Sequence, residues 1–441
     1  MGQEITAEAT WILLGLTTAA TFAAGFTRNR VPVAVSVGVA VVVRVAFAAL
    51  TSVAYTPIDV RQYFRQTANL VLLGQDPLHD MPGRQWNFLE LMPFVHAAEL
   101  RTGLPWVYAV KIVPIIADCV IVWIVSRLAS SDGRNRALQY AFNPLSLLVV
   151  ALHGQVEPIA LALALGGVLV LRARRPLLGG VLIGAAVAAK TWPVLILLTV
   201  LPLRSPSRIV RILIGSALVP VLCLLLGVAL LDTSPISDLK RMASYSSFVQ
   251  LWTWSGVLVQ LGRHRNLSEY NSPLSGLSSA FMVISVVIVL ILLRRRAPEI
   301  RTMAALSAVL IVTSGFGVQY LMWALPLIVA ISDRWRFTYI LTAGGWAAAF
   351  YLSPATKSVL NPYLAGLSWL PATLLFLVIA EQVQKEGLTA MVPRLRRLVR
   401  PAAGSPAAGS PAAGSPAAGS PAVPEEAEAA DGVEVGPKEN S

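Results

Sequence analysis

The sequence predicts an all-α polytopic membrane protein, a helical bundle of about thirteen transmembrane spans. Of its 441 residues, 56% are hydrophobic and only 13% are charged, whereas a soluble domain typically carries about 25% charged residues. The mean hydropathy is +0.67, and apolar runs long enough to cross or nearly cross a bilayer recur along the chain. These observations predict a protein whose main partner is the lipid bilayer.

The expected spans follow one another along the chain and are separated by short polar or basic segments. They lie near 9–26, 31–54, 106–126, 137–152, 157–171, 177–189, 191–203, 209–231, 273–293, 300–315, 318–331, 337–352 and 363–380. Arginine clusters such as 172–175 and 294–296 mark the cytoplasmic side of a plasma membrane. This rule predicts a multi-pass topology with the N-terminus outside and the C-terminus in the cytoplasm.

Two long polar segments, 55–105 and 232–272, then lie outside the cell. In the first, segments 58–73 and 85–100 lie between prolines and are expected to form amphipathic helices at the outer interface. Residues 1–400 form the expected membrane domain. Residues 401–441 carry Ser-Pro-Ala-Ala-Gly repeats and an acidic end, a composition typical of a disordered tail, here predicted to be cytoplasmic.

The composition also argues against several classes of partner. The net charge of +12 comes largely from arginine clusters between apolar runs, so it indicates membrane topology and no nucleic-acid partner. Cys119 and Cys223 both lie inside apolar runs, which predicts neither a disulfide nor a thiolate metal site. We expect no cofactor and assign no metal ligands, although the sequence leaves a divalent metal open.

Three stretches are too long for one span and short for two, and each has a polar interruption in the middle. They are 137–171, 177–203 and 300–331, interrupted at 153–157, 190–193 and 315–320. With both ends in the cytoplasm, each must form a helical hairpin whose arms reach roughly 20–24 Å, less than the ~30 Å hydrocarbon core. Polar backbone at such depth lines a wet cavity or is buried in protein, so we expect an outward-facing cavity. Tilted arms are the alternative.

Asp59 follows the second span and stands at the expected mouth of this cavity. A carboxylate there suits a general base that deprotonates a hydroxyl nucleophile. The alternative is a structural role in the first helical turn after Pro57, or an ion pair with Arg61 or Arg65.

His153, Gln155 and Glu157 share one hairpin tip, where they could orient sugar or acceptor hydroxyls. The alternative is that Glu157 caps the next helix and His153 bonds a carbonyl. Gln319 and Tyr320, at the third tip, are uncharged candidates for the same binding role. Asp118, inside the third span, is expected to pair with Lys111 as part of the structure.

Lys190 is an isolated cation in an apolar setting and suits a phosphate group, with snorkelling toward lipid headgroups as the alternative. Arg241, Arg263 and His264 are basic residues on the outer side, against the topological rule. They could bind an anionic donor or lipid headgroups.

Several short motifs follow one another along the chain: IDVRQYF at 58–64, LGQDPL at 73–78, WNFL at 86–89, NP at 143–144, GQVE at 154–157, AAKTWP at 188–193 and VQYLMWALP at 318–326. In this order they resemble the GT-C glycosyltransferases, especially glycosyltransferase family 87, which includes polyprenyl-phosphate-mannose-dependent mannosyltransferases of actinobacteria. The resemblance covers roughly 55–330.

The resemblance implies inverting transfer of a sugar, mannose first, from a polyprenyl-phosphate donor to a glycolipid or lipid-linked glycan at the outer face. The family's general base corresponds to Asp59, and Asp76 or Asp80 would supply the second acid of the first loop. Many members have Asp where this chain has Glu157. A lipid-linked-sugar flippase and a non-catalytic subunit of an envelope complex remain alternative functions. The sequence shows no internal repeat of the kind transporters often carry, which counts against the flippase.

Overall fold

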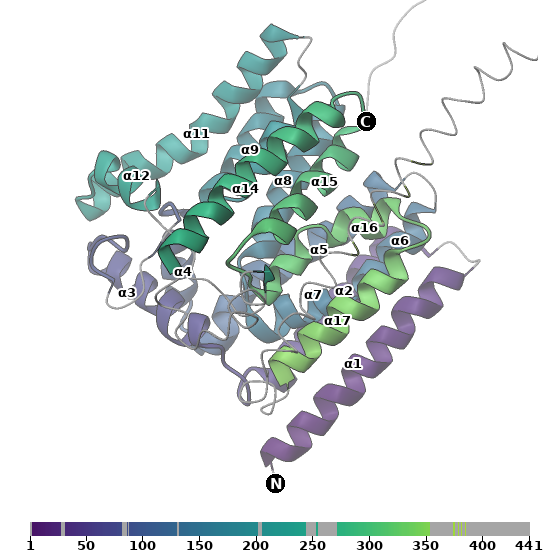
Figure 1. Ribbon diagram of the computed structural model, residues 1–441. Coiled ribbons are helices and arrows are strands. Elements are labelled where there is room, and N and C mark those ends of the chain that lie inside the picture. The colour runs from purple at the N-terminus through teal and green to yellow at the C-terminus, as the bar shows by residue number, and fades with distance from the viewer. Residues whose placement is uncertain are drawn as a thin grey trace, which may run out of the picture. The chain divides into compact units, whose positions relative to one another are not determined.

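A computed structural model describes most of the expected membrane domain. The described residues are 2–27, 31–81, 86, 88–129, 132–201, 205–243, 253–254 and 271–352, with single residues at 374, 378, 381 and 384. They form helices and connecting turns, and none of them lies in a strand (Figure 1). The all-α prediction is confirmed for this part of the chain. The boundary at 400 and the tail 401–441 lie outside the described residues.

Four described helices are long and apolar enough to cross a membrane: α1 (Gly2–Phe26), α2 (Val33–Thr51), α5 (Trp106–Leu128) and α11 (Pro206–Leu231). Other helices make up most of the rest: α6 (Gly133–Ala141), α7 (Pro144–Leu147), α8 (Glu157–Arg172), α9 (Pro176–Ala189), α10 (Val194–Val200), α12 (Pro235–Ala243), α14 (Asn271–Leu292), α15 (Pro298–Val312), α16 (Leu325–Ile331) and α17 (Arg336–Leu352). The protein is therefore a multi-pass membrane protein, while the count of about thirteen spans stays a prediction.

The three helical hairpins are interrupted where the polar tips were expected. The π-helix η2 (Leu148–His153) ends just before α8, α9 ends at Ala189 before α10, and α15 ends before the 3₁₀-helix η4 (Val318–Met322). Gly154 makes the first break possible because its φ is +81°, a conformation that costs a residue with a Cβ atom more. The predicted helix breaks are confirmed, while the depth and the side of the tips stay predictions.

The first outer segment folds into three short helices: the π-helix η1 (Asp59–Phe64), α3 (Arg65–Leu72) and α4 (Leu91–Arg101). The helix expected at 58–73 is confirmed, although it opens with a π-helical turn. The helix expected at 85–100 begins later, at Leu91, and places Pro93 in its first turn, where a missing N–H costs little.

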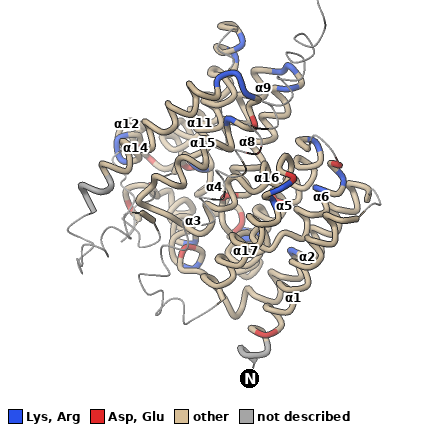
Figure 2. The backbone as a smooth tube through the Cα atoms, turned by 45° about the vertical axis from the view of Figure 1, so that its right-hand side comes forward, with Lys and Arg blue, Asp and Glu red and all other residues tan. Residues whose placement is uncertain are grey.

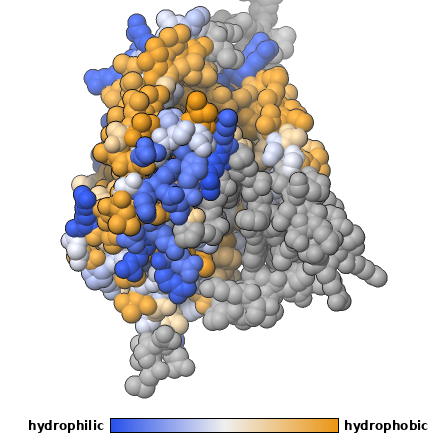
Figure 3. All heavy atoms as spheres, turned by 90° about the vertical axis from the view of Figure 1, so that its left-hand side faces the viewer, coloured by the Kyte–Doolittle hydropathy of each residue, from blue (hydrophilic) through white to orange (hydrophobic). Residues whose placement is uncertain are grey.

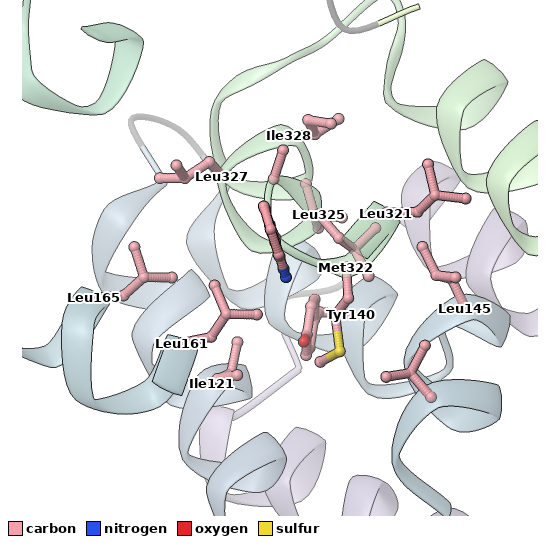
Figure 4. Close-up of a cluster of buried hydrophobic side chains, with 14 of the residues drawn as sticks. Ile121, Tyr140, Leu145, Leu161, Leu165, Leu321, Met322, Leu325, Leu327 and Ile328 are labelled. Atoms are coloured by element: carbon pink, nitrogen blue, oxygen red, sulfur yellow. The ribbon is translucent and has the colours of Figure 1, made fainter. Parts of the chain in front are cut away.

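The core lies under the hairpin tips. Side chains from α5, α6, α7, α8, η4 and α16 interdigitate there (Figure 4), and the labelled ones are Ile121, Tyr140, Leu145, Leu161, Leu165, Leu321, Met322, Leu325, Leu327 and Ile328. On another side of the bundle, α9 packs closely on α11. A Cβ on Gly180 or Gly184 would stand 2.3 Å from the carbonyl oxygen of Ile212 or Ser216, so small residues permit this contact. This packing holds α9, the helix that leads into the second tip, against α11.

Charged residues avoid the middles of most helices. In Figure 2, Lys and Arg gather toward the upper side of the view, at the ends of α5, α6, α8 and α9, while the helical bodies are mostly uncharged. This distribution agrees with clusters of basic residues on one side of a membrane. The orientation of the two termini stays a prediction.

Asp118 lies inside the bundle, and its partner differs from the expected one. Asp118 on α5 pairs with Arg44 on α2, with 2.5 Å between Arg44 Nε and Asp118 Oδ2, and both side chains are fully buried. The Tyr140 hydroxyl donates to Asp118 Oδ1 over 2.7 Å. Lys111 instead donates to Ser52 Oγ and to the Leu152 carbonyl oxygen, over 2.8 and 2.7 Å. The expected pair of Asp118 with Lys111 is wrong, because these two positions on α5 face different neighbours.

We expect Arg44→Met to destabilise the protein by about 3–5 kcal/mol, because the substitution leaves Asp118 buried without its cation. Thermal unfolding in detergent measures the loss. The double variant Arg44→Met/Asp118→Leu should recover most of it, and the exposed Arg134→Met serves as the matched control. Equal stability of Arg44→Met and Arg134→Met would contradict the structural role.

Candidate active site

The three hairpin tips meet one another. Lys190 of the second tip bonds to the Glu157 carboxylate of the first. Trp192 stacks on Trp323, which follows the third tip, with 4.6 Å between ring centroids. Trp192 and Trp323 are 131 positions apart, so these contacts bring distant parts of the chain into one cluster, as the hairpins predict. Most of its side chains are buried, so the tips pack against one another and do not simply line an open hollow.

Asp59 joins this cluster from the first outer segment. It begins η1, two residues after Pro57, and the Gln155 amide donates to its Oδ2 over 3.1 Å. His153 Nε2 lies 3.6 Å from the same oxygen, and the Asp59 side chain is 23% exposed. Asp59 is therefore fixed from one side by the first tip and is still reachable from solvent.

The hydrogen bonds around His153 indicate the roles of its two ring nitrogens. Its Nδ1 lies 2.8 Å from the Tyr351 hydroxyl, and its Nε2 lies 2.6 Å from Gln155 Nε2. Since the Gln155 amide nitrogen is a donor, His153 Nε2 accepts and Nδ1 carries the proton toward Tyr351. One amide group therefore donates to both the carboxylate and the imidazole, and it holds the two in a fixed relation.

The ion pair of Lys190 and Glu157 lies beside this network. Glu157 is fully buried and Lys190 is 7% exposed, and the ammonium also stands over the Phe88 and Tyr320 rings at 5.4 and 5.7 Å. Glu157 Oε2 has no hydrogen-bond partner among the described residues. A buried carboxylate oxygen in that state is suited to accept a ligand hydroxyl.

Two tyrosines connect the parts of the cluster. Tyr351 on α17 is buried and lies close enough to both Asp59 and Glu157 to be affected by their charges. Burial, with a further contribution from Asp59, raises the pKa of Tyr55 to about 12. A tyrosine is protonated at neutral pH even at its ordinary pKa, so the shift keeps the Tyr55 hydroxyl neutral in alkaline solution as well.

The structure separates some of the residues that the sequence singled out. Asp59, His153, Gln155, Glu157, Lys190 and Tyr320 belong to one cluster. Gln319 lies next to Tyr320 on η4, with its side chain folded against Gly317. Asp76 and Arg241 belong instead to a second cluster, where Asp76 bonds to His79 and Arg241 lies on α12. Arg263 and His264 lie outside the described residues.

Sequence reasoning missed Tyr351, His79, Glu90 and Asp238. Tyr351 lies in an apolar run, and nothing near it in the sequence signals a site. Glu90 had a usable signal, since a carboxylate between Leu89 and Leu91 is unusual in a segment that packs against helices. His79 and Asp238 gain meaning only when the fold brings them together.

The apolar helices and the buried polar cluster define a multi-pass membrane protein that holds an accessible carboxylate beside an imidazole and an ion pair. Residues 104–318 match the model of glycosyltransferase family 87. The resemblance to that family is thereby confirmed over this stretch, and the match supports a membrane glycosyltransferase. The matched stretch contains His153, Gln155, Glu157 and Lys190 but begins after Asp59. No curated protein matches the chain.

Proposed function

We propose that this protein transfers a sugar, mannose first, from a polyprenyl-phosphate donor to a glycolipid or lipid-linked glycan at the extracytoplasmic face. The observation that carries the proposal is the meeting of Asp59 with the tip of His153 and Gln155, next to Lys190 and Glu157. A carboxylate base, hydroxyl-binding groups and a cation are the parts that inverting sugar transfer requires.

The transfer step assigns a role to each part. Asp59 takes the proton of the acceptor hydroxyl as its oxygen forms a bond to the anomeric carbon. The bond between that carbon and the phosphate oxygen breaks, and the electron pair leaves with the polyprenyl phosphate. Attack opposite the leaving group inverts the anomeric configuration. Gln155 and His153 hold the Asp59 carboxylate in line with the acceptor.

The donor phosphate is assigned to Lys190, with Arg241, Arg263 and His264 as further basic groups. Because Lys190 already bonds to Glu157, it would share its three N–H donors between this carboxylate and the phosphate. Glu157 Oε2, Gln319 and Tyr320 are the proposed hydroxyl-binding groups beside it. Asp76 lies in the second cluster, where it bonds to His79. Its proposed role toward the acceptor is therefore indirect.

An apolar groove of about 540 Å³ between α2 and α5 is our candidate for the polyprenyl tail. Six of its lining residues are Val41, Val45, Ile112, Ile116, Val120 and Trp123. Ile112 follows Lys111, whose ammonium donates to the carbonyl oxygen of Leu152, next to His153. One lining residue of the groove is therefore adjacent in sequence to Lys111, the side chain that bonds to the first tip.

Filling the groove with Ile116→Trp should raise KM for a long-chain donor about tenfold, if roughly two CH₂ groups lose their contacts. A donor with a short chain that does not reach the groove should show little change. Leu222→Trp, on the exposed apolar surface of α11, is the matched control. An equal rise in KM for both donors, or for both variants, would remove the tail from this groove.

A panel of polyprenyl-phosphate sugars, offered to purified protein in liposomes that contain extracted envelope lipids, tests the proposed function. We expect transfer of radiolabel from one donor into the glycolipid fraction. Movement of labelled donor between leaflets without a new glycolipid would indicate a flippase. Neither transfer nor movement with any donor would favour a non-catalytic subunit.

A further inference from the structure

A second cluster of ionisable side chains lies apart from Asp59. It brings together Asp76 and His79, from the turn after α3, and Asp238, from α12. One ligand atom from each residue lies within 4.8 Å of the other two. The segments are far apart in the sequence, and Figure 1 shows α12 on the same side of the molecule as α3 and α4.

His79 is the centre of the contacts in this cluster. Its Nδ1 lies 2.6 Å from Asp76 Oδ2 and 3.5 Å from Asp238 Oδ1, and its Nε2 lies 2.8 Å from Ser237 Oγ. Asp76 Oδ1 accepts from the Leu78 amide over 2.7 Å, which fixes the carboxylate. The His79 side chain is 32% exposed, so an ion can reach the cluster from solvent. Figure 3 shows hydrophilic side chains gathered on the face that includes this side of the molecule.

Glu90 is the independent observation that points to a ligand. It is fully buried, and neither of its carboxylate oxygens has a hydrogen-bond partner among the described residues. Its Oε1 stands beside Thr233, at the corner between α11 and α12, within 3.3 Å of the position that a Cβ on Gly227 would take. Thr233 is also a neighbour of the Asp238 side chain, so Glu90 borders the cluster.

The carboxylates of this arrangement outnumber the positive charges beside them. Glu90 and Asp238 are both fully buried, and burying a carboxylate costs its hydration. Glu90 brings the carboxylates to three, while the positive charges beside them are Arg241 on α12, which acts on Asp238, and His79 when it is protonated. A divalent cation would neutralise two negative charges and would bond to the oxygens that now lack donors.

We propose that Asp76, His79, Asp238 and Glu90 form a binding site for a divalent cation. Three carboxylates with one imidazole favour a first-row transition ion such as Mn²⁺ or Zn²⁺ over Mg²⁺ or Ca²⁺, which prefer ligand sets made of oxygen. This site departs from the sequence-based expectation of no metal ligands. The inference does not rest on the proposed sugar transfer, because binding is measured without activity.

The ion would join the first outer segment to α12. Leu89 packs with Ala188 and Cys223, and Leu91 and Met242 pack against the same group. Phe88, next to Leu89, contacts Lys190. The cation site would therefore hold the segment around Phe88 against the tip that carries Lys190, and would act on the first cluster only through this packing.

The test uses the full chain, purified with a tag free of histidine in an uncharged maltoside detergent and treated with EDTA. Elemental analysis after dialysis against MnCl₂, ZnCl₂, MgCl₂ or CaCl₂ should find one bound Mn²⁺ or Zn²⁺ per chain. At about 100 times Kd, this ion should raise the unfolding temperature by several degrees. Glu90→Gln should weaken binding at least tenfold, and Glu8→Gln, an exposed carboxylate on α1, should bind as the wild type does.

Glu90→Gln also distinguishes a cation site from a cluster whose carboxylates are neutralised by bound protons. If the carboxylates are satisfied by protons alone, the neutral amide leaves stability unchanged or raises it, and none of the four ions changes the unfolding temperature. That result, with less than a tenth of an equivalent of metal in the wild type, would overturn the proposal. Asp238→Asn provides a second variant, expected to lose the same ion.

Discussion

Asp59→Asn is expected to lower the turnover of sugar transfer by about 100- to 10,000-fold, the range that general-base catalysis contributes. An amide cannot take the proton of the acceptor hydroxyl, although it fills the same space. Donor binding and the unfolding temperature should stay close to those of the wild type, since Asp59 is partly exposed and the tip of His153 and Gln155 stays in place. Turnover with saturating donor and acceptor in liposomes is the measurement.

Asp232→Asn is the matched control for this variant. Asp232 is also on the expected outer side, is exposed, and has a φ of +51° that asparagine tolerates well. It should transfer sugar at the wild-type rate. If Asp59→Asn keeps most of its turnover, the base lies elsewhere.

Lys190→Met has the second large effect that we expect. It leaves Glu157 buried without its cation, and breaking such a pair destabilises a protein by about 3–5 kcal/mol. Transfer should fall as well, because the donor phosphate loses a positive charge. Unfolding in detergent and KM for the donor are the two measurements.

The double variant Lys190→Met/Glu157→Gln separates the two roles of Lys190. Removing both charges should restore most of the stability, since no uncompensated ion stays buried. If Lys190 binds the donor phosphate, KM for the donor in the double variant stays well above that of Glu157→Gln alone, which loses only the carboxylate proposed to bind a hydroxyl. Recovery of both stability and KM would show that the pair is structural, and the phosphate would then have to be bound by other basic groups.

The positions of the helix breaks could be predicted from the sequence, because polar residues interrupt apolar runs that are flanked by basic clusters. His153 to Glu157 and Lys190 to Pro193 do form turns between helices. Short helical arms predict that these turns lie at a similar depth and therefore near one another. The sequence does not predict that the turns are buried against one another, since this burial depends on aromatic pairs such as Trp192 with Trp323.

Pairings between helices could not be predicted in the same way. Arg44 meets Asp118 because of how α2 and α5 are rotated about their axes, and the sequence does not specify that rotation. The sequence predicts that Glu157 binds a hydroxyl and that Lys190 binds a phosphate, whereas in the structure the two side chains bond to each other. The cluster of Asp76 with Asp238 joins segments from the two outer loops, so it becomes visible only in three dimensions.

The most direct test of the account is transfer from radiolabelled polyprenyl-phosphate mannose to envelope glycolipid by the purified wild-type protein, with the anomeric configuration of the product read by NMR. We predict a labelled glycolipid whose new linkage is inverted relative to the donor, and no such product with Asp59→Asn. Retention of configuration, or equal product from the wild type and Asp59→Asn, would contradict the account.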